Sequence, residues 1–373
     1  MAFAEEPDAG MARPRMLVLA RESRGMTQGD VAAAMIRVLD GDGAVSQGYV
    51  SKAEAGRLSV GDDRLKLFAA ALGYPVSLLT LDDDVYGVGV GLVYHRKRAS
   101  LSATALRRIH AMLNLTRIQI RALLDASSRP PVDRFITFEV DDFDTAEDAA
   151  QALRAEWGLP NGPVKSVIGA IEDAGGMVAA RVLAGRGLDA VSQRPATGNP
   201  VFLAHAVAPA DRQRFTLAHE IGHVVMHRVP AAGQEQQADQ FASEFLMPAR
   251  DIRAYFSGRL DLARFLELKA VWGVSAAALA YRAHALGAVS DWQYRQLQIE
   301  MSALGYRTTE PSPLTPERPT ALPRLVKSLM RPRCYTAADL AQLTHLSESE
   351  FAGLYLSDDP ATFNEDPNTR GGH

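Results

Sequence analysis

The stretch RFTLAHEIGHVVMH, residues 214–227, constrains the fold and chemistry of this 373-residue chain more than any other. Most of it suits a buried helix, yet His219, Glu220 and His223 interrupt the apolar run. On a helix, residues four apart project from one face, one turn apart. The two imidazoles can therefore bind one zinc ion while Glu220 reaches a water at the metal, as in the H-E-x-x-H arrangement. The alternative is two core histidines that each bond to a nearby carbonyl group.

A third ligand is expected on a second helix that follows soon after. EQQADQFASEFLMP, residues 235–248, has apolar residues at helical spacing and ends at Pro248. Glu235 could complete a His-His-Glu zinc site and leave a fourth position for water. Asp239, one turn later, could accept a hydrogen bond from a ligand imidazole and so fix its tautomer. On its own, a glutamate and an aspartate at this spacing are more typical of a solvated helix face.

Together the two segments resemble the ImmA/IrrE metallopeptidase family, whose signature is H-E-x-G-H, then E-x-x-A-[ND]-x-F-A and a closing L-M-P. The resemblance implies that Glu220 is the general base and that the zinc ligands are His219, His223 and Glu235. The sequence departs from the family at Gln237, where many members carry a second glutamate, and this favours Glu235 as the ligand. His227 lies one turn further along, where we expect it to pack or to polarise substrate rather than to bind metal.

Residues 14–80 have a different pattern, in which a helix, a turn and a second helix follow one another. Arg24-Gly25 is predicted to end the first helix, Thr27 to cap the second and Ser46 to cap the third. This order resembles the helix-turn-helix domain of the XRE (Cro/cI-like) repressors, in which the segment 46–55 would be the recognition helix. The resemblance implies a double-stranded DNA operator, with Gln28 placed for phosphate. The other contacts would come from Ser46 at the start of the recognition helix and from Gln47, Tyr49 and Lys52, which we expect to be exposed.

One departure from the XRE pattern concerns the connection between the second and third helices. Between Ala33 and Val45 the chain has several residues more than the usual tight turn, so we expect an extended second helix and a longer loop at 41–43. The alternative for residues 14–80 is an interaction module that does not bind DNA. The net charge of −4 gives no overall attraction to nucleic acid, so binding would have to come from a local patch.

The chain as a whole predicts a mostly α fold with a small β-sheet (α+β). Residues 132–250 would form the zincin-like peptidase domain, with an extended RFITFEV segment, a strand after Gly175-Gly176 and two strands flanking the PATGNP turn. An exposed strand beside the zinc helix would bind a peptide substrate by strand addition. The remaining predicted segments are a disordered 1–13, connecting helices as a pair at 94–128, a helical extension at 251–306, a Pro-rich linker at 307–323, a helix pair at 324–356 and a disordered 357–373.

Two functions fit these features. The first is a DNA-binding transcriptional regulator whose zinc-dependent endopeptidase cleaves a regulatory protein, such as a repressor or a cognate toxin. The second is a non-catalytic repressor or antitoxin whose peptidase fold senses metal or binds a partner. The resemblance to XRE repressors also implies a homodimer, because such repressors bind DNA as dimers. The single cysteine, Cys334, the acidic amino terminus and the lack of an apolar run of about 18 residues favour a cytoplasmic protein with no membrane segment.

Overall fold

The described part of the chain begins with a bundle of short helices, two of which start at a capping side chain. A computed structural model describes residues 10–41, 44–82, 93–94, 102–127, 132–141, 143–183, 188–195, 198–229, 232–331 and 334–357. The bundle contains α1 (Pro14–Ser23), α2 (Gln28–Val38), α3 (Gln47–Glu54), α4 (Asp62–Leu72) and α5 (Val76–Leu79). Thr27 and Asp30 form a reciprocal capping box at the start of α2, and the Ser46 hydroxyl caps α3. The sequence predicts both caps, so the helix-turn-helix connection is specified locally.

The connection between α2 and α3 is longer than in a tight turn. As predicted, α2 continues past Ala33 and ends at Val38. Asp40 and Gly41 follow with positive φ values of 52° and 86°, a conformation that aspartate and glycine adopt more readily than most residues. Residues 42 and 43 of the predicted loop lie outside the described residues. Because α2 and α3 still pack against each other, the longer connection does not separate the two helices.

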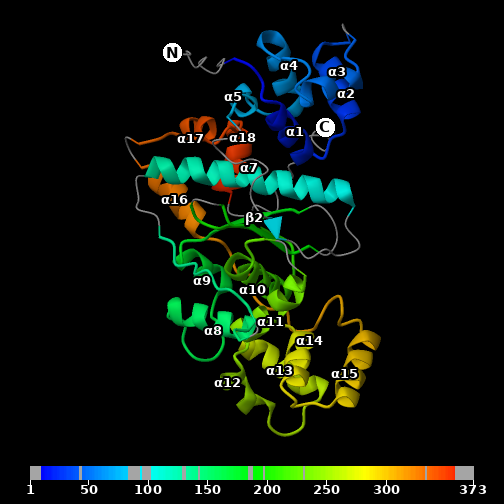
Figure 1. Cartoon of the computed structure of the whole chain (residues 1–373), viewed down its shortest axis with the longest axis vertical. Coiled ribbons are helices and arrows are strands. Elements are labelled where there is room, and N and C mark those ends of the chain that lie inside the picture. Colours follow the sequence, from blue (N-terminus) through cyan, green and yellow to red (C-terminus); the bar gives the residue numbers. More distant parts are fainter. Residues whose placement is uncertain are drawn as a thin grey trace.

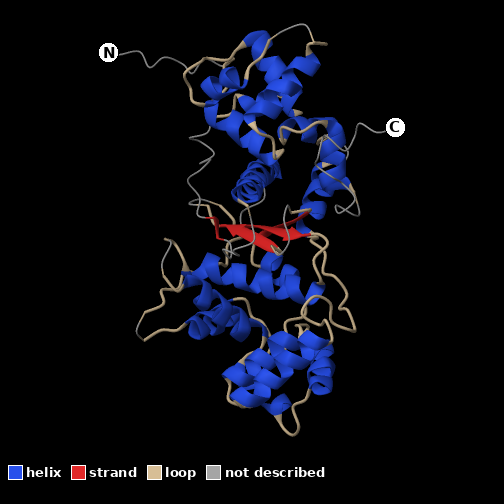
Figure 2. Ribbon diagram, turned by 90° about the vertical axis from the view of Figure 1, so that its right-hand side faces the viewer, coloured by secondary structure: helices blue, strands red, loops and turns tan. Residues whose placement is uncertain are grey.

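A small sheet lies in the middle of the molecule, with helices on both sides (Figure 1 and Figure 2). Its strands are β1 (Val93–Tyr94), β2 (Met177–Arg181), β3 (Ala190–Gln193) and β4 (Val201–His205), in the order β1-β3-β4-β2. β3 is antiparallel to both β1 and β4, whereas β4 and β2 are parallel. The sequence predicts β2, β3 and β4. It does not predict β1, whose last residue lies at the start of the segment expected to be helical.

The two faces of the sheet belong to two separate hydrophobic cores. Successive side chains of a strand point to opposite faces. Accordingly, Val191 of β3 lies in the core shared with the amino-terminal bundle, and Ala190 lies in the core shared with the later helices. In Figure 1 the long helix α7 (Ala103–Ser127) crosses one side of the sheet and α10 (Ala210–Met226) lies on the other. The sheet is therefore the layer that joins the bundle to the helices of the candidate site.

The predicted pair of connecting helices is wrong, because α7 is one continuous helix of 25 residues. No glycine or proline interrupts the sequence from Ala103 to Ser127, so nothing breaks the helix locally. Its buried residues pack against α1 on one side and against β3 and β4 on the other. The continuous helix therefore lies between the bundle and the sheet and packs against both.

The second core is built from helices that follow the sheet strands or lie between them. They are α8 (Ala146–Glu156), α9 (Val167–Asp173), α10, α11 (Gln234–Leu246), α12 (Ala249–Ile252), η1 (Arg253–Phe256), α13 (Leu262–Trp272), α14 (Ala276–Ala285) and α15 (Asp291–Ala303). The RFITFEV segment, predicted to be extended, has no strand partner among the described residues. Its Phe138 N–H instead donates to the Val225 carbonyl near the end of α10, 3.0 Å away. None of the described helices is long and apolar enough to cross a membrane.

The Pro-rich segment 307–320 is held against the second core rather than acting as a free linker. Glu310 accepts a hydrogen bond of 2.9 Å from Lys269 of α13. Glu317 forms an ion pair with Arg214 of α10. Both cations are buried, with exposed fractions of 1% for Lys269 and 6% for Arg214. The prediction of a linker is therefore wrong. Proline content indicates a stiff backbone, but it does not show that Glu310 and Glu317 pair with buried cations.

The carboxyl-terminal helices return to the amino-terminal bundle. They are α16 (Ala321–Leu329), which begins inside the predicted linker, then α17 (Ala337–Leu343), α18 (Glu348–Phe351) and η2 (Ala352–Leu356). Glu350 of α18 pairs with Arg24 at the end of α1 at 2.6 Å. His345 Nδ1 lies 2.9 Å from the Ser77 hydroxyl of α5. Residues 1–9 and 358–373 lie outside the described residues. The disorder predicted for residues 10–13 and for Ser357 is wrong, because Ala12 and Arg13 donate backbone hydrogen bonds to Val60 and Leu79 and Ser357 donates one to Ala352.

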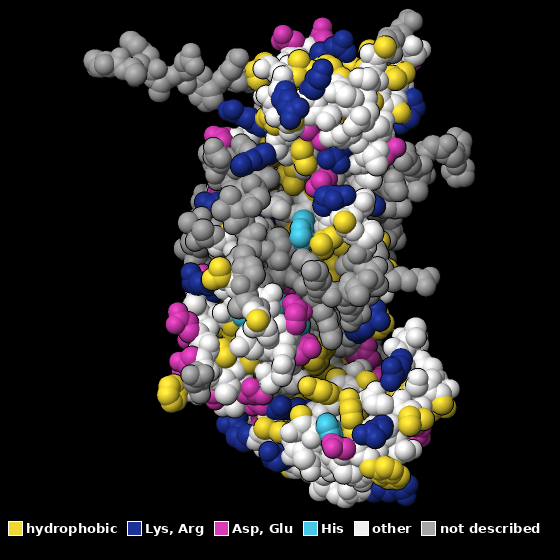
Figure 3. All heavy atoms as spheres, turned by 45° about the vertical axis from the view of Figure 1, so that its right-hand side comes forward, with side chains coloured by type: hydrophobic (Ala, Val, Ile, Leu, Met, Phe, Trp, Pro, Cys, Tyr) yellow, Lys and Arg dark blue, Asp and Glu magenta, His cyan; other side chains and the backbone are white. Residues whose placement is uncertain are grey.

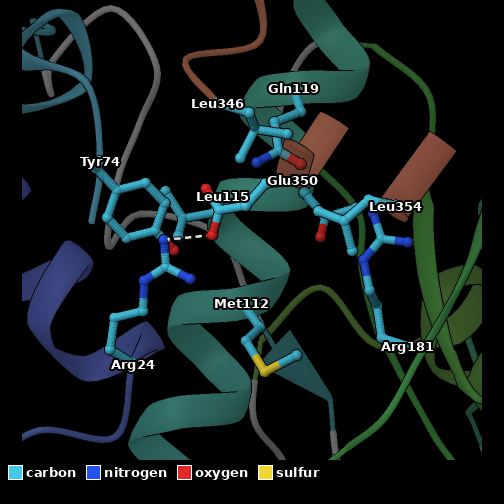
Figure 4. A pocket seen from close by; sticks show the side chains of 10 residues that line it. Arg24, Tyr74, Met112, Leu115, Gln119, Arg181, Leu346, Glu350 and Leu354 are labelled. Carbon is cyan, nitrogen blue, oxygen red and sulfur yellow. Dashed lines mark ion pairs between the residues drawn. The ribbon is translucent and has the colours of Figure 1, made fainter. Parts of the chain in front are cut away.

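A small cavity marks the point where the bundle, α7, the sheet and the carboxyl-terminal helices meet (Figure 4). Arg24 and Tyr74 line it from the bundle, Gln119 from α7, Arg181 from β2 and Glu350 from α18. Its volume of about 20 Å³ has room for roughly one water molecule. The cavity is therefore a feature of the junction between the parts and is too small to bind a peptide.

Candidate functional site

The candidate metal ligands lie on α10 and α11, which approach closely at a glycine. A Cβ atom on Gly222 of α10 would lie 3.1 Å from the ring of Phe241 of α11. That separation is tighter than ordinary van der Waals contact, so a larger residue would push the two helices apart. The close approach allows Glu235, in the first turn of α11, to reach the histidines of α10.

The side chains of His219, His223 and Glu235 converge on one point. The Nε2 atoms of the two histidines lie 3.1 Å apart. Glu235 Oε2 lies 3.6 Å from His219 Nε2, and Glu235 Oε1 lies 3.5 Å from His223 Nε2. Zinc with ligand atoms at about 2.0–2.1 Å in a tetrahedron places those atoms about 3.3–3.4 Å from one another. The three measured separations are close to that value. Among the described residues, His219, His223 and Glu235 therefore form a group that could hold a metal ion.

A hydrogen-bonded chain fixes the tautomer of His223. His227 Nε2 lies 2.9 Å from the side-chain oxygen of Gln237, which accepts, so this nitrogen carries the proton of a neutral His227. His227 Nδ1 is then an acceptor, and His223 Nδ1, 2.9 Å away, donates to it. The Nε2 atom of His223 is left with a lone pair that points to the converging atoms. His227 therefore orients the imidazole of His223, a role that differs from the packing or substrate polarisation expected from the sequence.

Asp239 fixes the tautomer of His219 in the same way. Its carboxylate lies 2.8 Å from His219 Nδ1, which must donate because a carboxylate only accepts. In neutral His219 the lone pair is thus on Nε2. Facing it is Glu235 Oε2, a buried carboxylate oxygen with no hydrogen-bond partner. Two imidazole lone pairs and a carboxylate gathered at one point need a cation between them, so the residues present fit a zinc ion.

Glu220 lies beside this group and is almost completely buried, with 1% of its surface exposed. The hydroxyl of Ser192, on β3, donates to Glu220 Oε2 at 2.6 Å. Sequence reasoning missed Ser192, because it lies 28 residues before Glu220 and a buried serine in a strand carries no local signal. The sheet therefore orients the carboxylate that the sequence predicts to be the general base.

The environment shifts the proton affinities of these groups in different directions. Burial raises the pKa of Glu220 to about 8, although the charge of His219 and the Ser192 hydrogen bond oppose the shift. Burial lowers the pKa of His223 to about 4. Burial also disfavours charged His219, but its hydrogen bond with Asp239 and the neighbouring carboxylate of Glu235 outweigh that effect and raise the pKa to about 9. The ligand set therefore attracts one proton at neutral pH, which a metal ion would displace on binding.

The predicted DNA contacts lie on one part of the amino-terminal bundle. Ser46, Gln47 and Lys52 are exposed on α3 and at its cap. Gln47 donates its amide N–H to the side-chain oxygen of Gln28 at 2.7 Å, so the first residues of α2 and α3 are linked. Gln28 in turn donates to Glu54 at 2.8 Å. The amide of Gln28 is therefore engaged within the bundle and holds Gln47, rather than pointing freely toward a phosphate.

Tyr49 differs from the expectation that it is exposed. Its ring stacks on Phe68 of α4 with centroids 6.1 Å apart, and the side chain is half-buried. The guanidinium carbon of Arg64 lies 5.5 Å from the centroid of the Tyr49 ring. Tyr49 thus belongs to the edge of the bundle core. On the face shown in Figure 3, Lys and Arg side chains are dispersed over the bundle and form no continuous basic patch.

Two family models match separate parts of the chain. A helix-turn-helix model matches residues 17–79, and a model of the IrrE N-terminal-like domain matches residues 174–284. The first match covers α2 and α3, and the second covers β2 to β4 together with α10 and α11. They confirm the predicted fusion of an XRE-type helix-turn-helix domain with an ImmA/IrrE-type domain. A search among curated proteins found no match to the chain.

Proposed function

We propose that this chain, which joins a helix-turn-helix domain to an IrrE N-terminal-like domain, is a DNA-binding transcriptional regulator with a zinc-dependent endopeptidase. One observation carries the proposal, namely three ligand atoms 3.1–3.6 Å apart beside a buried glutamate. His219, His223 and Glu235 would hold the zinc ion. Asp239 and the pair His227 and Gln237 would keep the two imidazoles in the required tautomers.

The proposed reaction is hydrolysis of a peptide bond. When bound, zinc supplies a Lewis acid that polarises the scissile carbonyl and lowers the pKa of a water molecule. Glu220 takes a proton from the attacking water and passes it to the leaving nitrogen as the carbon–nitrogen bond breaks. The water oxygen becomes part of the new carboxylate. Burial raises the pKa of Glu220, and a carboxyl group with a raised pKa accepts a proton more readily than an exposed one.

Ser192 has a defined part in this reaction. Its hydroxyl holds one oxygen of Glu220 through the 2.6 Å hydrogen bond and leaves the other for the proton. A purely metal-sensing protein would need the three ligands but not a carboxylate oriented from the opposite side by the sheet. The arrangement of Ser192 and Glu220 therefore favours the endopeptidase over the non-catalytic repressor or antitoxin.

The helix-turn-helix domain would recognise a double-stranded operator, with Gln47 and Lys52 as its exposed contacts on α3. A regulator of this kind would act in the cytoplasm, as a homodimer on a pseudo-palindromic operator. Its substrate would be a regulatory protein, such as a repressor or a cognate toxin. Cleavage of that protein would couple the zinc site to the transcriptional response.

Metal stoichiometry tests the ligand assignment. Purified protein should contain about one zinc per chain, and His223→Ala should lose most of it because two remaining ligands bind weakly. His284→Ala is the matched control, since His284 pairs with Asp291 on α15 and lies outside the site. Unchanged zinc in His223→Ala, or an equal loss in both variants, would refute the assignment.

A further inference from the structure

The outer edge of β3 lies next to the carboxylate proposed as the base. The side chain of Ser192 points to α10 and bonds to Glu220, whereas Val191 points to the opposite core. The backbone of Ser192 is therefore separated from the Glu220 carboxylate by the length of one serine side chain. Because strand addition is a common way for a protein to bind an extended peptide, this edge is suited to place a polypeptide beside the base.

This edge is already paired. Val93 lies opposite Gln193 and Tyr94 lies opposite Ser192, in antiparallel register. β1 also contacts α10, the helix that carries the metal ligands. Residues directly opposite in an antiparallel pair have Cα atoms about 4.5–5.5 Å apart. The sequence predicts an exposed strand beside the zinc helix, but the structure places another part of the same chain on that strand.

The strand on this edge belongs to neither matched domain. Val93 and Tyr94 lie between Leu79, the end of α5, and Ala103, the start of α7. They are also outside the two family-model matches, at 17–79 and 174–284. Among the described residues, the contact between β1 and β3 consists of two residue pairs, and a pairing of this length is weak by itself. An external strand that pairs over more residues can therefore replace it.

We propose that the Val93–Tyr94 strand of the same chain is a resident occupant of the outer edge of β3, the edge at which the zinc site is expected to bind an extended polypeptide. A protein substrate would then bind as an extended segment, antiparallel to β3, after displacing this strand. The ligand class is set by backbone pairing, so the edge selects an unfolded or extended segment rather than a folded surface. The use of this edge for substrate binding rests on the proposed function, but its occupancy by Val93–Tyr94 can be tested separately.

Peptide binding to the full chain tests the occupancy. All proteins carry Glu220→Gln, so that no cleavage is needed or expected, and the probe is a fluorescent peptide that copies residues 88–99. Replacement of Val93 and Tyr94 by proline removes the backbone N–H groups and should vacate the edge. The probe should then bind about tenfold or more tightly, because the tethered competitor is gone. Replacement of both residues by alanine keeps the N–H groups and should leave probe affinity as in the parent protein.

A thermal melt of each protein verifies that the substitutions leave the fold intact. Equal probe affinity in all three proteins, including undetectable binding in all three, would overturn the proposal. So would hydrolysis of the zinc-loaded chain between Leu79 and Ala103 when Glu220 is present, since the segment would then be a substrate and not an occupant. Failure of the zinc assignment would appear in the metal analysis and would leave the probe-binding result unaffected, so the two proposals can fail independently.

Discussion

His223 donates a hydrogen bond of 2.9 Å from its Nδ1 atom to Nδ1 of His227. The opposite nitrogen of His227 lies 2.9 Å from the side-chain oxygen of Gln237. In this series of hydrogen bonds Gln237 needs to supply only an acceptor oxygen, and an amide supplies one as well as a carboxylate does. The departure from the family pattern at this position is therefore compatible with an intact zinc site.

The first prediction concerns Gln237. Gln237→Leu removes the acceptor that fixes His227, and should weaken zinc binding by about 10- to 100-fold, the usual cost of losing such a supporting residue. Gln237→Glu retains an acceptor and should bind zinc as tightly as the natural protein. Competition with a chelator measures both affinities. Equal affinity in the leucine variant would show that the chain of hydrogen bonds does not orient His223.

A second prediction concerns Ser192. Ser192→Ala leaves the buried Glu220 oxygen without its donor, and should lower kcat for cleavage of fluorescently labelled casein by about tenfold or more. KM and zinc content should change little, because Ser192 is not a ligand. Ser192→Thr keeps the hydroxyl and should recover part of the rate. A loss of zinc in the alanine variant would instead indicate a structural role.

The third prediction is a pH dependence of stability. Lys269 is buried between Asp211 and Glu310, and although burial opposes its charge, these two carboxylates raise its pKa above 10.5. A raised pKa in the folded state means that the stabilisation is complete below about 10.5 and is lost as pH rises through the folded-state pKa. Lys269→Met should cost about 3 kcal/mol or more, because it leaves two carboxylates without their partner.

Denaturant unfolding at several pH values measures this effect. The free-energy difference between the natural protein and Lys269→Met should be constant from about pH 8 to 10 and should shrink above about 10.5. Lys66→Met is the control, since Lys66 is exposed on α4 and pairs with exposed Asp63. A difference that grows at high pH would contradict the assigned direction of the shift.

A fourth prediction separates DNA binding from the zinc site. Gln47→Ala should cost roughly 1–3 kcal/mol of binding to an operator in the protein's own promoter region. Lys52→Ala should weaken binding to all sequences and reduce the salt dependence by about one ion. Neither should alter zinc content. Fluorescence anisotropy at several salt concentrations checks both, and the absence of sequence-specific binding by the natural protein would exclude the repressor function.

Part of the candidate site could be predicted because it is encoded locally. Helical spacing places His219 and His223 on one face, and the short interval to Glu235 and Asp239 brings the second helix within reach. The caps at Thr27 and Ser46 are predictable for the same reason.

The rest depends on contacts between distant parts of the chain. Ser192 meets Glu220 only because β3 packs on α10. Glu310 and Glu317 read as members of a Pro-rich linker until their buried partners are known. Tyr49 has the spacing of an exposed residue on α3, but Phe68 of α4 covers one face of its ring. No local pattern distinguishes these residues from solvated ones.

The most direct test of the account compares zinc-loaded natural protein with zinc-loaded Glu220→Gln in hydrolysis of labelled casein. Glu220 is not a ligand, so both proteins should contain about one zinc per chain. The natural protein should cleave the substrate, and Glu220→Gln should not, because the amide cannot take the proton from water. Equal hydrolysis by the two proteins at equal zinc content would contradict the central claim that Glu220 is the base of a zinc endopeptidase.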